Sequence, residues 1–275
     1  MSDSTIAFIG GGNMARSLVG GLVAAGTSST RISVSEPLPE IRNKLLEDFG
    51  VNVHAENISA ATGAHVIVLA VKPQVLQEVV VPLRDLIAEH RPLLISVAAG
   101  VTAPSIERWV GDRPALVRVM PNTPALVGAG ISALYANKNV REDQRELAEM
   151  IMSAVGKTVW IENESLMDTV TAVSGSGPAY FFYVMQAIKD AAAAEGLDED
   201  TARLLVLETA LGAARLAVAS VEDPGTLQKQ VTSPGGTTEA AINVLDSSRV
   251  SKAFEKAVSA ARARGGELAE LLDRD

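Results

Sequence analysis

The sequence predicts an α/β protein in which a Rossmann-type, doubly wound, mostly parallel sheet is followed by an all-helical C-terminal domain. Short apolar segments alternate with helical segments over residues 1–162, which is typical of parallel strands covered by helices. The first apolar segment runs directly into the glycine-rich residues 10–15. After residue 162 the strand pattern stops, and alanine- and leucine-rich helical segments follow. We therefore predict two domains, residues 1–162 and 163–275.

The composition is that of a globular protein and excludes several kinds of partner. Hydrophobic residues make up 47% of the 275 residues, enough for two cores. A net charge of −9 without a Lys/Arg cluster argues against a nucleic-acid partner, which needs a basic face. With no cysteine and three scattered histidines, we expect no metal. We see neither a secretory signal nor a membrane span, so we expect a cytoplasmic protein with no membrane partner.

Residues 5–9 are predicted to form a buried strand that leads into a glycine-rich turn. Residues 13–25 then show the apolar spacing of a helix. A G-x-G-x-x-A pattern between a strand and a helix binds the pyrophosphate of a dinucleotide. Gly10 allows the tight turn, Gly12 lets the pyrophosphate touch the backbone, and the helix N-terminus faces the negative charge. We therefore expect the first domain to bind a nicotinamide dinucleotide.

The second strand, residues 31–35, ends at an acidic residue, Glu36. An acidic residue here accepts hydrogen bonds from the adenosine ribose, which favours NAD over NADP. Glu36 would repel a 2′-phosphate if its carboxylate points inward. Ser35 and Arg42, in contrast, are able to bind that phosphate. The choice between NADPH and NADH therefore stays open.

The rest of the first domain predicts further strands, and their ends predict a ligand crevice. The strands are expected at residues 51–53, 64–71, 93–98, 115–120, 130–135 and 157–161. The last two would complete the sheet at one edge. Ligands bind outside the carboxyl ends of parallel strands. This rule places residues 70–73, 98–100 and 120–124 around one crevice, with Lys72 and Asn122 as its polar members, although either side chain could instead hold a loop.

The second half reads as helices with more apolar surface than one small lobe can bury. Residues 163–165 resemble a helix cap, and residues 173–178 interrupt the helix that follows. Pro178 suits the first turn of the next helix. Residues 201–219 are apolar on nearly every side, which is typical of a central helix. A dimer formed through these helices is the simplest explanation.

A polar, glycine-rich loop, Val-Thr-Ser-Pro-Gly-Gly-Thr-Thr-Glu at residues 231–239, opens one of the later helices. Such a loop presents free backbone N–H groups, small hydroxyls and the positive end of the helix dipole, which suit a carboxylate or a phosphate. An ordinary capped turn between two helices is the alternative.

Four segments together resemble the pyrroline-5-carboxylate reductase family. They are residues 8–14, 70–74, 174–180 and 227–246, of which the last carries the family signature. The resemblance runs nearly end to end. It implies reduction of 1-pyrroline-5-carboxylate to L-proline, the last step of L-proline biosynthesis, with hydride from NADPH or also NADH. It also implies a homodimer, with five dimers in a ring. At Glu36 the sequence departs from the family pattern, and this acidic residue puts the family's preference for NADPH in doubt here.

The resemblance also assigns roles to individual residues. Thr238 is expected to be catalytic, with its Oγ hydrogen-bonded to the ring nitrogen. The substrate carboxylate is expected at the N–H groups of Gly236 and Thr237 and the Ser233 hydroxyl. Glu164 either favours the iminium cation or only begins its helix. The expected substrate-binding residues are Glu164, Ser233, Gly235, Gly236, Thr237 and Thr238. The expected cofactor-binding residues are Gly10, Gly12, Asn13, Met14, Ser35, Glu36, Asn57, Ala70, Val71, Lys72, Pro73 and Ala98.

Two alternative functions stay open at this point. A β-hydroxyacid dehydrogenase, or another imine reductase, would share the two-domain design. The dehydrogenases carry a lysine general acid followed one turn later by asparagine, whereas here Ala193 follows Lys189 at that spacing. A non-catalytic NAD(P)-binding sensor would keep residues 10–15 and lose the substrate loop, which is intact here.

Overall fold

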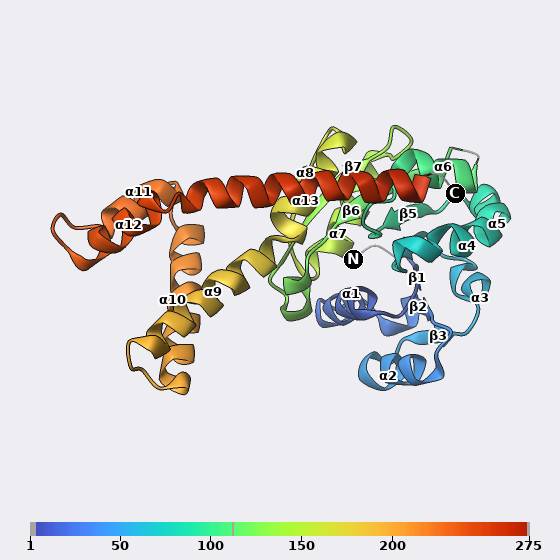
Figure 1. Cartoon of the computed structure of the whole chain (residues 1–275). Helices are drawn as coiled ribbons and strands as arrows, with labels where there is room; N and C mark the ends of the chain where they lie inside the picture. Colours follow the sequence, from blue (N-terminus) through green and yellow to red (C-terminus); the bar gives the residue numbers. More distant parts are fainter. Residues whose placement is uncertain (1–3, 112, 274–275) are drawn as a thin grey trace. The chain divides into compact units, whose positions relative to one another are not determined.

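The computed structural model describes residues 4–111 and 113–273 (Figure 1). Contacts divide the chain into two compact units, Met1–Ser176 with Ala261–Asp275, and Gly177–Ala260. The first unit holds the sheet, and the second is helical. Residues 163–176 and the end of the last helix therefore group with the sheet, although no strand follows residue 162 among the described residues. The predicted division at 162/163 stays a prediction about functional domains.

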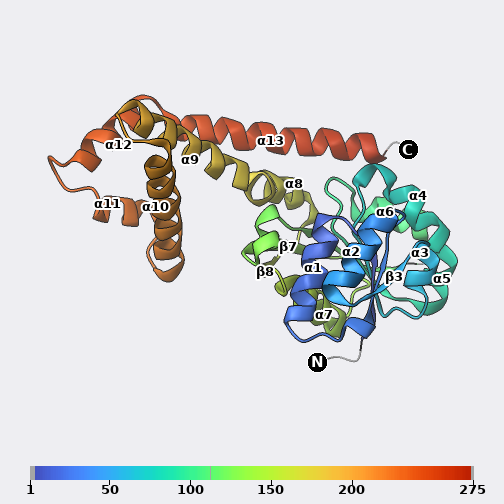
Figure 2. The same ribbon diagram turned by 90° about the horizontal axis from the view of Figure 1, so that it is seen from below.

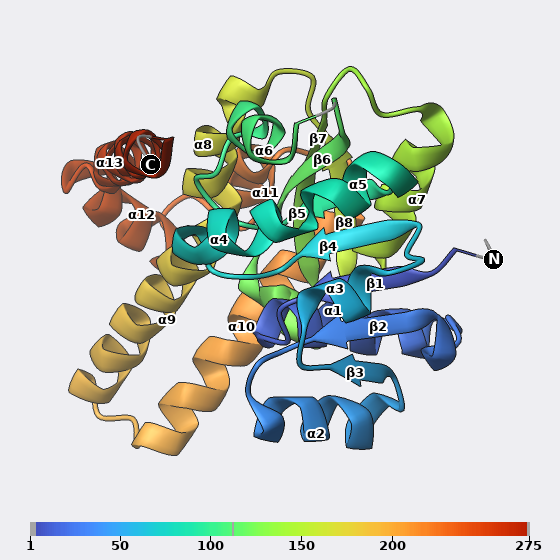
Figure 3. The ribbon, with the colours of Figure 1, turned by 90° about the vertical axis from the view of Figure 1, so that its right-hand side faces the viewer.

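Within the described residues, one eight-stranded sheet has the order β3-β2-β1-β4-β5-β6-β7-β8. Figure 3 shows β4 between β1 and β5. All neighbouring strands run parallel except β6 and β7. The predicted doubly wound, mostly parallel sheet is thus confirmed, and its order reverses between β1 and β4, where such folds bind ligands. The strands are β1 (Ile6–Ile9), β2 (Ile32–Ser35), β3 (Asn52–His54), β4 (Val66–Leu69), β5 (Leu93–Ser96), β6 (Ala115–Met120), β7 (Gly130–Ala136) and β8 (Gly156–Trp160).

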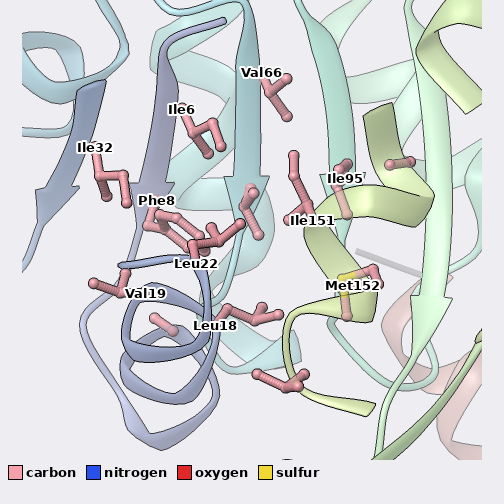
Figure 4. Close-up of a cluster of buried hydrophobic side chains, with 14 of the residues drawn as sticks. Ile6, Phe8, Leu18, Val19, Leu22, Ile32, Val66, Ile95, Ile151 and Met152 are labelled. Carbon is pink, nitrogen blue, oxygen red and sulfur yellow. The ribbon is translucent and has the colours of Figure 1, made fainter. Parts of the chain in front are cut away.

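Helices cover both faces of this sheet, and each face has its own core. Along β1, Ile6 and Phe8 face one cluster, whereas Ala7 and Ile9 face the other, because alternate side chains of a strand point to opposite faces. Figure 4 shows the first cluster around Phe8. The helices of this unit are α1 (Asn13–Ala24), α2 (Pro39–Phe49), α3 (Asn57–Ala61), α4 (Leu76–Val80), α5 (Arg84–His90), α6 (Ala103–Val110), α7 (Glu142–Ser153) and α8 (Met167–Val170). Short 3₁₀ turns are η1 (Ser29–Arg31), η2 (Pro73–Val75), η3 (Val81–Leu83), η4 (Thr123–Val127) and η5 (Glu164–Leu166).

The predicted interruption at residues 173–178 is a π-helical turn, η6 (Thr171–Gly175), followed by a bend. A Cβ at Gly175 would lie 2.5 Å from the Met120 Cε, so a larger residue does not fit there without movement. Asn122 holds this turn, because its Nδ2 donates to the Ser174 carbonyl (3.1 Å) and its Oδ1 accepts from the Ile131 N–H (3.0 Å). Asn122 is buried, and these two hydrogen bonds show that it holds a loop, which is one of its two expected roles.

The second unit consists of helices that expose much apolar surface. Of the residues of α10, only Ala202 and Val206 are buried. Phe181 on α9 and Val218 on α10 are 69% and 87% exposed. The helix pair therefore has apolar faces that a single chain does not cover. The helices are α9 (Gly177–Ala194), α10 (Glu199–Ala219), α11 (Pro224–Gln230), α12 (Thr237–Ser247) and α13 (Val250–Asp273), of which α13 runs from this unit into the first.

No single helix among the described residues has the length and apolar character needed to cross a membrane. The pair α10 and α11, bent by 118°, meets the length and composition criteria only when the two are taken together.

Candidate active site

The turn between β1 and α1 consists of glycines, so its backbone is not covered by side chains at the carboxyl end of β1. Gly10 has φ +100°, and a Cβ there would lie 2.7 Å from the Ala70 carbonyl oxygen, so only glycine suits this position. Gly12 is the N-cap of α1, and an added Cβ there would meet nothing within 4 Å. No side chain in the described residues caps this helix. The first-turn N–H groups, including those of Asn13 and Met14, are thus available to an anion.

The residues after β4 lie beside this turn. The Ala70 N–H donates to the Ile9 carbonyl (2.9 Å), which places the strand end next to Gly10. Lys72 is exposed, and its side chain makes no hydrogen bond with the described residues. Pro73 begins η2. The structure therefore shows no loop-holding bond for Lys72, and its predicted contact with a cofactor stays a prediction.

Ser35 and Asn57 meet at the end of β2. The Ser35 hydroxyl donates to Asn57 Oδ1 (2.8 Å) and lies 3.4 Å from the Phe8 carbonyl oxygen. Ser35 is fully buried, and Asn57 begins α3. The structure thus brings these two predicted cofactor-binding residues together with the end of β1.

The Glu36 carboxylate points toward the glycine-rich turn. Its Oε2 accepts from the Gly11 N–H (3.0 Å) and its Oε1 from the Leu38 N–H (3.1 Å), and the residue is only 8% exposed. Arg42, considered for the 2′-phosphate, donates from Nη1 to the Glu36 (2.6 Å) and Pro37 (2.8 Å) carbonyls. Both carboxylate oxygens of Glu36 are engaged, and its hydrogen bonds to a ribose stay a prediction.

The loop after β5 leads into α6 and carries Ala98. Ala98 is 3% exposed, so its contribution to a ligand would come from the backbone. The Val97 N–H donates to the Leu69 carbonyl (3.2 Å), which keeps the loop beside β4. Thr102 caps α6 through its Oγ1, which accepts from the Ser105 N–H (3.3 Å). The predicted Ala98 position thus lies at the same sheet edge as the glycine-rich turn.

Glu164 belongs to the sheet unit and is held by two partners. Its Oε1 accepts from the Ala103 N–H (2.7 Å) at the start of α6 and from Arg118 Nη1 on β6 (2.9 Å). The two charged side chains are 18% and 7% exposed. Tyr135 lies opposite Arg118 on β7, and its own burial, followed by the negative charge of Glu164, raises the pKa of its hydroxyl. Glu164 does begin η5, but the pairing with Arg118 has no local signal in the sequence.

The second unit carries the loop between α11 and α12, which lies at the end of that unit (Figure 2). Gly235 has φ +71°, and its N–H donates to Glu239 Oε2 (2.8 Å). The Gly236 N–H, predicted to bind the substrate carboxylate, donates instead to the Ser233 carbonyl (3.0 Å). Gly236 is the N-cap of α12, and no side chain in the described residues caps it. The N–H groups of Thr237 and Thr238, in the first turn, form no hydrogen bond with the described residues.

The structure therefore gathers the predicted cofactor residues at one sheet edge and leaves the loop residues 233–238 together in the other unit. Ser233, Thr237 and Thr238 are all exposed in the chain. Within the described residues, no group of three or more His, Asp or Glu side chains is arranged to hold a metal ion.

Two family models match separate parts of the chain. Residues 164–268 match the family model described as pyrroline-5-carboxylate reductase dimerisation. Residues 5–100 match the model described as NADP oxidoreductase, coenzyme F420-dependent. The pyrroline-5-carboxylate reductase of Pseudomonas aeruginosa is 47% identical over 272 residues, covering 99% of both chains.

Solved structures of similar proteins cover nearly the whole chain. A pyrroline-5-carboxylate reductase from Coxiella burnetii is 46% identical with a TM-score of 0.94, covering 97% of this chain and 99% of its own. A pyrroline carboxylate reductase from Plasmodium falciparum, solved with NADP bound, is 29% identical with a TM-score of 0.86 and covers 98% and 99%.

Proposed function

The chain belongs to the pyrroline-5-carboxylate reductase family, and from this premise we propose that it reduces the cyclic imine 1-pyrroline-5-carboxylate to L-proline. It is an oxidoreductase that takes hydride from a reduced nicotinamide cofactor, and this reaction completes L-proline biosynthesis. The observation that carries the proposal is the full-length match to relatives of this name, together with an intact loop at residues 233–238. We also place the reaction in the cytoplasm, which cell fractionation would test.

We propose NADPH as the preferred cofactor, with NADH also accepted. The glycine-rich turn fits a dinucleotide pyrophosphate, because Gly12 is open and the start of α1 has no capping side chain among the described residues. Both oxygens of the Glu36 carboxylate already accept from the Gly11 and Leu38 N–H groups, so they are not free to accept from the ribose hydroxyls that NADH would present. When bound, the reduced nicotinamide supplies the hydride. Ser35, Asn57, residues 70–73 and Ala98 would line the rest of the cofactor's path.

The loop before α12 is proposed to hold the substrate. Its carboxylate would accept hydrogen bonds from the N–H groups of Thr237 and Thr238 and from the Ser233 hydroxyl, at the positive end of an 11-residue helix. Gly235 and Gly236 allow the ligand to approach the backbone closely. We revise the predicted use of the Gly236 N–H, since that group donates to Ser233.

Thr238 is proposed as the catalytic residue. Its Oγ would hydrogen-bond the ring nitrogen and so orient the imine carbon for hydride attack. A strong acid is not required, because the imine is able to bind already protonated. Most of the rate would then come from positioning the two reactants, which supplies many orders of magnitude in enzymes.

The test is to mix the protein with the cyclic imine and with NADPH or NADH separately, and to follow the loss of the reduced nicotinamide's absorbance. We expect imine-dependent oxidation with L-proline as the product, and a higher kcat/KM with NADPH. Oxidation with 3-hydroxyacids instead would support a β-hydroxyacid dehydrogenase. Cofactor binding without turnover of any imine would support a sensor.

The chain forms homo-oligomers through its helical unit, and we propose a dimer, with five dimers in a ring. Leu204 and Leu211 lie on one face of α10 and are 61% and 43% exposed. Changing both to Asp costs the single chain little but buries charge in the dimer, so we expect monomers at micromolar concentration by light scattering. Asp200→Ala, an exposed change on the same helix, should leave the mass unchanged. A monomeric wild-type protein would contradict the proposed dimer.

A further inference from the structure

Arg118 and Glu164 form an ion pair inside the sheet unit, at 2.9 Å between Nη1 and Oε1. The arginine side chain is 7% exposed and the glutamate 18%. Taking two charges out of water costs about as much as their attraction returns, so such a pair is weak evidence for a stabilising role alone. The pair does fix the relative position of the two side chains, because separating them would leave each as a buried, uncompensated charge.

The pair joins three segments that are distant in the sequence. Arg118 lies within β6, which has strands on both sides. Glu164 begins η5 and also accepts from the Ala103 N–H (2.7 Å), the first residue of α6. The start of α6 is thereby fastened to the sheet through Glu164. The loop at residues 98–102 ends where that helix starts, so its position follows from the same contacts.

The end of α13 contacts the same region from another side. Asp273 Oδ1 accepts from the Ser105 hydroxyl and from Arg108 Nη2 (2.6 Å), both on α6. A Cβ added to Gly100 would lie 3.4 Å from the Leu272 Cδ1. The loop between β5 and α6 is thus held at its end by Glu164, while the end of α13 bonds to α6 and approaches the loop at Gly100.

The position of the loop at residues 98–102 in the sheet indicates which half of a bound dinucleotide it would border. In a doubly wound sheet the adenosine ribose lies at the end of β2, and the dinucleotide crosses the switch point between β1 and β4. The loop after β5 lies on the far side of β4 from β2, so it borders the nicotinamide half.

We propose that Arg118 is a positioning residue for the cofactor: through Glu164 it fixes the start of α6, and so holds the loop at residues 98–102 where the nicotinamide half binds. This inference rests on the proposed function. It gives Glu164 a role in cofactor binding through Ala103. A preformed loop lowers the ordering cost of binding, so loosening it weakens the cofactor complex.

The experiment compares Arg118→Met, Glu164→Gln and the double variant. NADPH Kd is measured by fluorescence titration without imine, and KM for NADPH and for imine are measured with both present. We expect each single variant to bind NADPH about tenfold more weakly, which corresponds to about 1.4 kcal/mol of added ordering cost, with imine KM changed by less than about twofold. The double variant should be no weaker than the singles, because the two residues act as one unit.

Arg84→Met is the matched control, because Arg84 holds the other end of α6. Its Nε and Nη2 donate to the Trp109 carbonyl (3.0 and 2.6 Å). We expect this variant to lower the Tm and leave the NADPH Kd unchanged. Arg118→Lys keeps the charge and should bind NADPH more tightly than Arg118→Met, which a loss of packing alone would not produce.

An unchanged NADPH Kd in folded Arg118→Met would overturn the proposal. If Arg118→Met does not fold, an unchanged Kd in both Arg118→Lys and Glu164→Gln would do the same. A raised imine KM in Glu164→Gln with normal NADPH binding would also overturn it and assign Glu164 to the substrate. If wild-type protein fails to reduce the imine, the proposed function falls, while the NADPH titrations still decide the role of Arg118.

Discussion

Replacing Thr238 with valine is expected to lower kcat about a hundredfold or more, the usual effect of removing one hydrogen bond aimed at the reacting group. Valine keeps the shape of threonine and loses only the hydroxyl, and the backbone N–H at 238 stays in place for the substrate carboxylate. We therefore expect the imine KM to change little. NADPH Kd should stay normal, because the glycine-rich turn belongs to the other compact unit.

Thr232→Val is the matched control for this variant. Thr232 lies in the same loop, but its hydroxyl donates to the Gln228 carbonyl (2.7 Å), so its loss should affect stability and not the reaction step. Thr238→Ser should recover much of the rate, since it restores the hydroxyl. Steady-state kinetics with both substrates varied measures all three. Wild-type kcat in Thr238→Val would remove this hydroxyl from the mechanism.

The sheet was predictable because its signal is local. Short runs such as Ile6–Ile9 are buried on both faces, and a run of apolar residues between turn signals is what such a strand requires. The glycine-rich turn was predictable for the same reason, since its residues are neighbours in the chain. The antiparallel direction of β7 against β6 was not predicted, because apolar patterning does not encode the direction in which a strand runs.

The side-chain directions at the site were less predictable, because they depend on partners far away in the sequence. Glu36 follows β2 as expected, yet its carboxylate meets the Gly11 N–H, 25 positions earlier. Glu164 is recognisable from its place at a helix start, but its partner Arg118 is not, since no spacing rule links β6 to η5. The partner of Gly236 lies within the same loop, because the Gly236 N–H donates to the Ser233 carbonyl and closes a tight turn. A sequence motif therefore locates a functional residue in the fold, whereas the packing around that residue determines its hydrogen-bond partners.

The Glu36→Ala variant distinguishes two roles for Glu36. The dinucleotide-binding motif predicts that it binds the adenosine ribose, whereas the observed contacts indicate that it holds the glycine-rich turn. Under the motif rule, Glu36 faces the ribose, so its removal should favour NADPH over NADH. In the structure its carboxylate holds the Gly11 and Leu38 N–H groups, so alanine leaves both without their acceptor. Each such loss costs about 1–3 kcal/mol when the group stays buried. We therefore expect NADPH and NADH both to bind more weakly, by about tenfold or more, as the glycine-rich turn loosens.

The ratio of the two Kd values is the deciding quantity, because loosening the turn affects the part that both cofactors share. We expect it to stay within about twofold of wild type, since the difference between the cofactors lies in the 2′-phosphate alone. Fluorescence titration of each reduced cofactor measures it, and Glu40→Ala, an exposed change in the first turn of α2, is the control. A large gain for NADPH with unchanged NADH binding would show that the carboxylate acts on the ribose. Equal losses would mean that this acidic residue shapes the turn and does not select the cofactor.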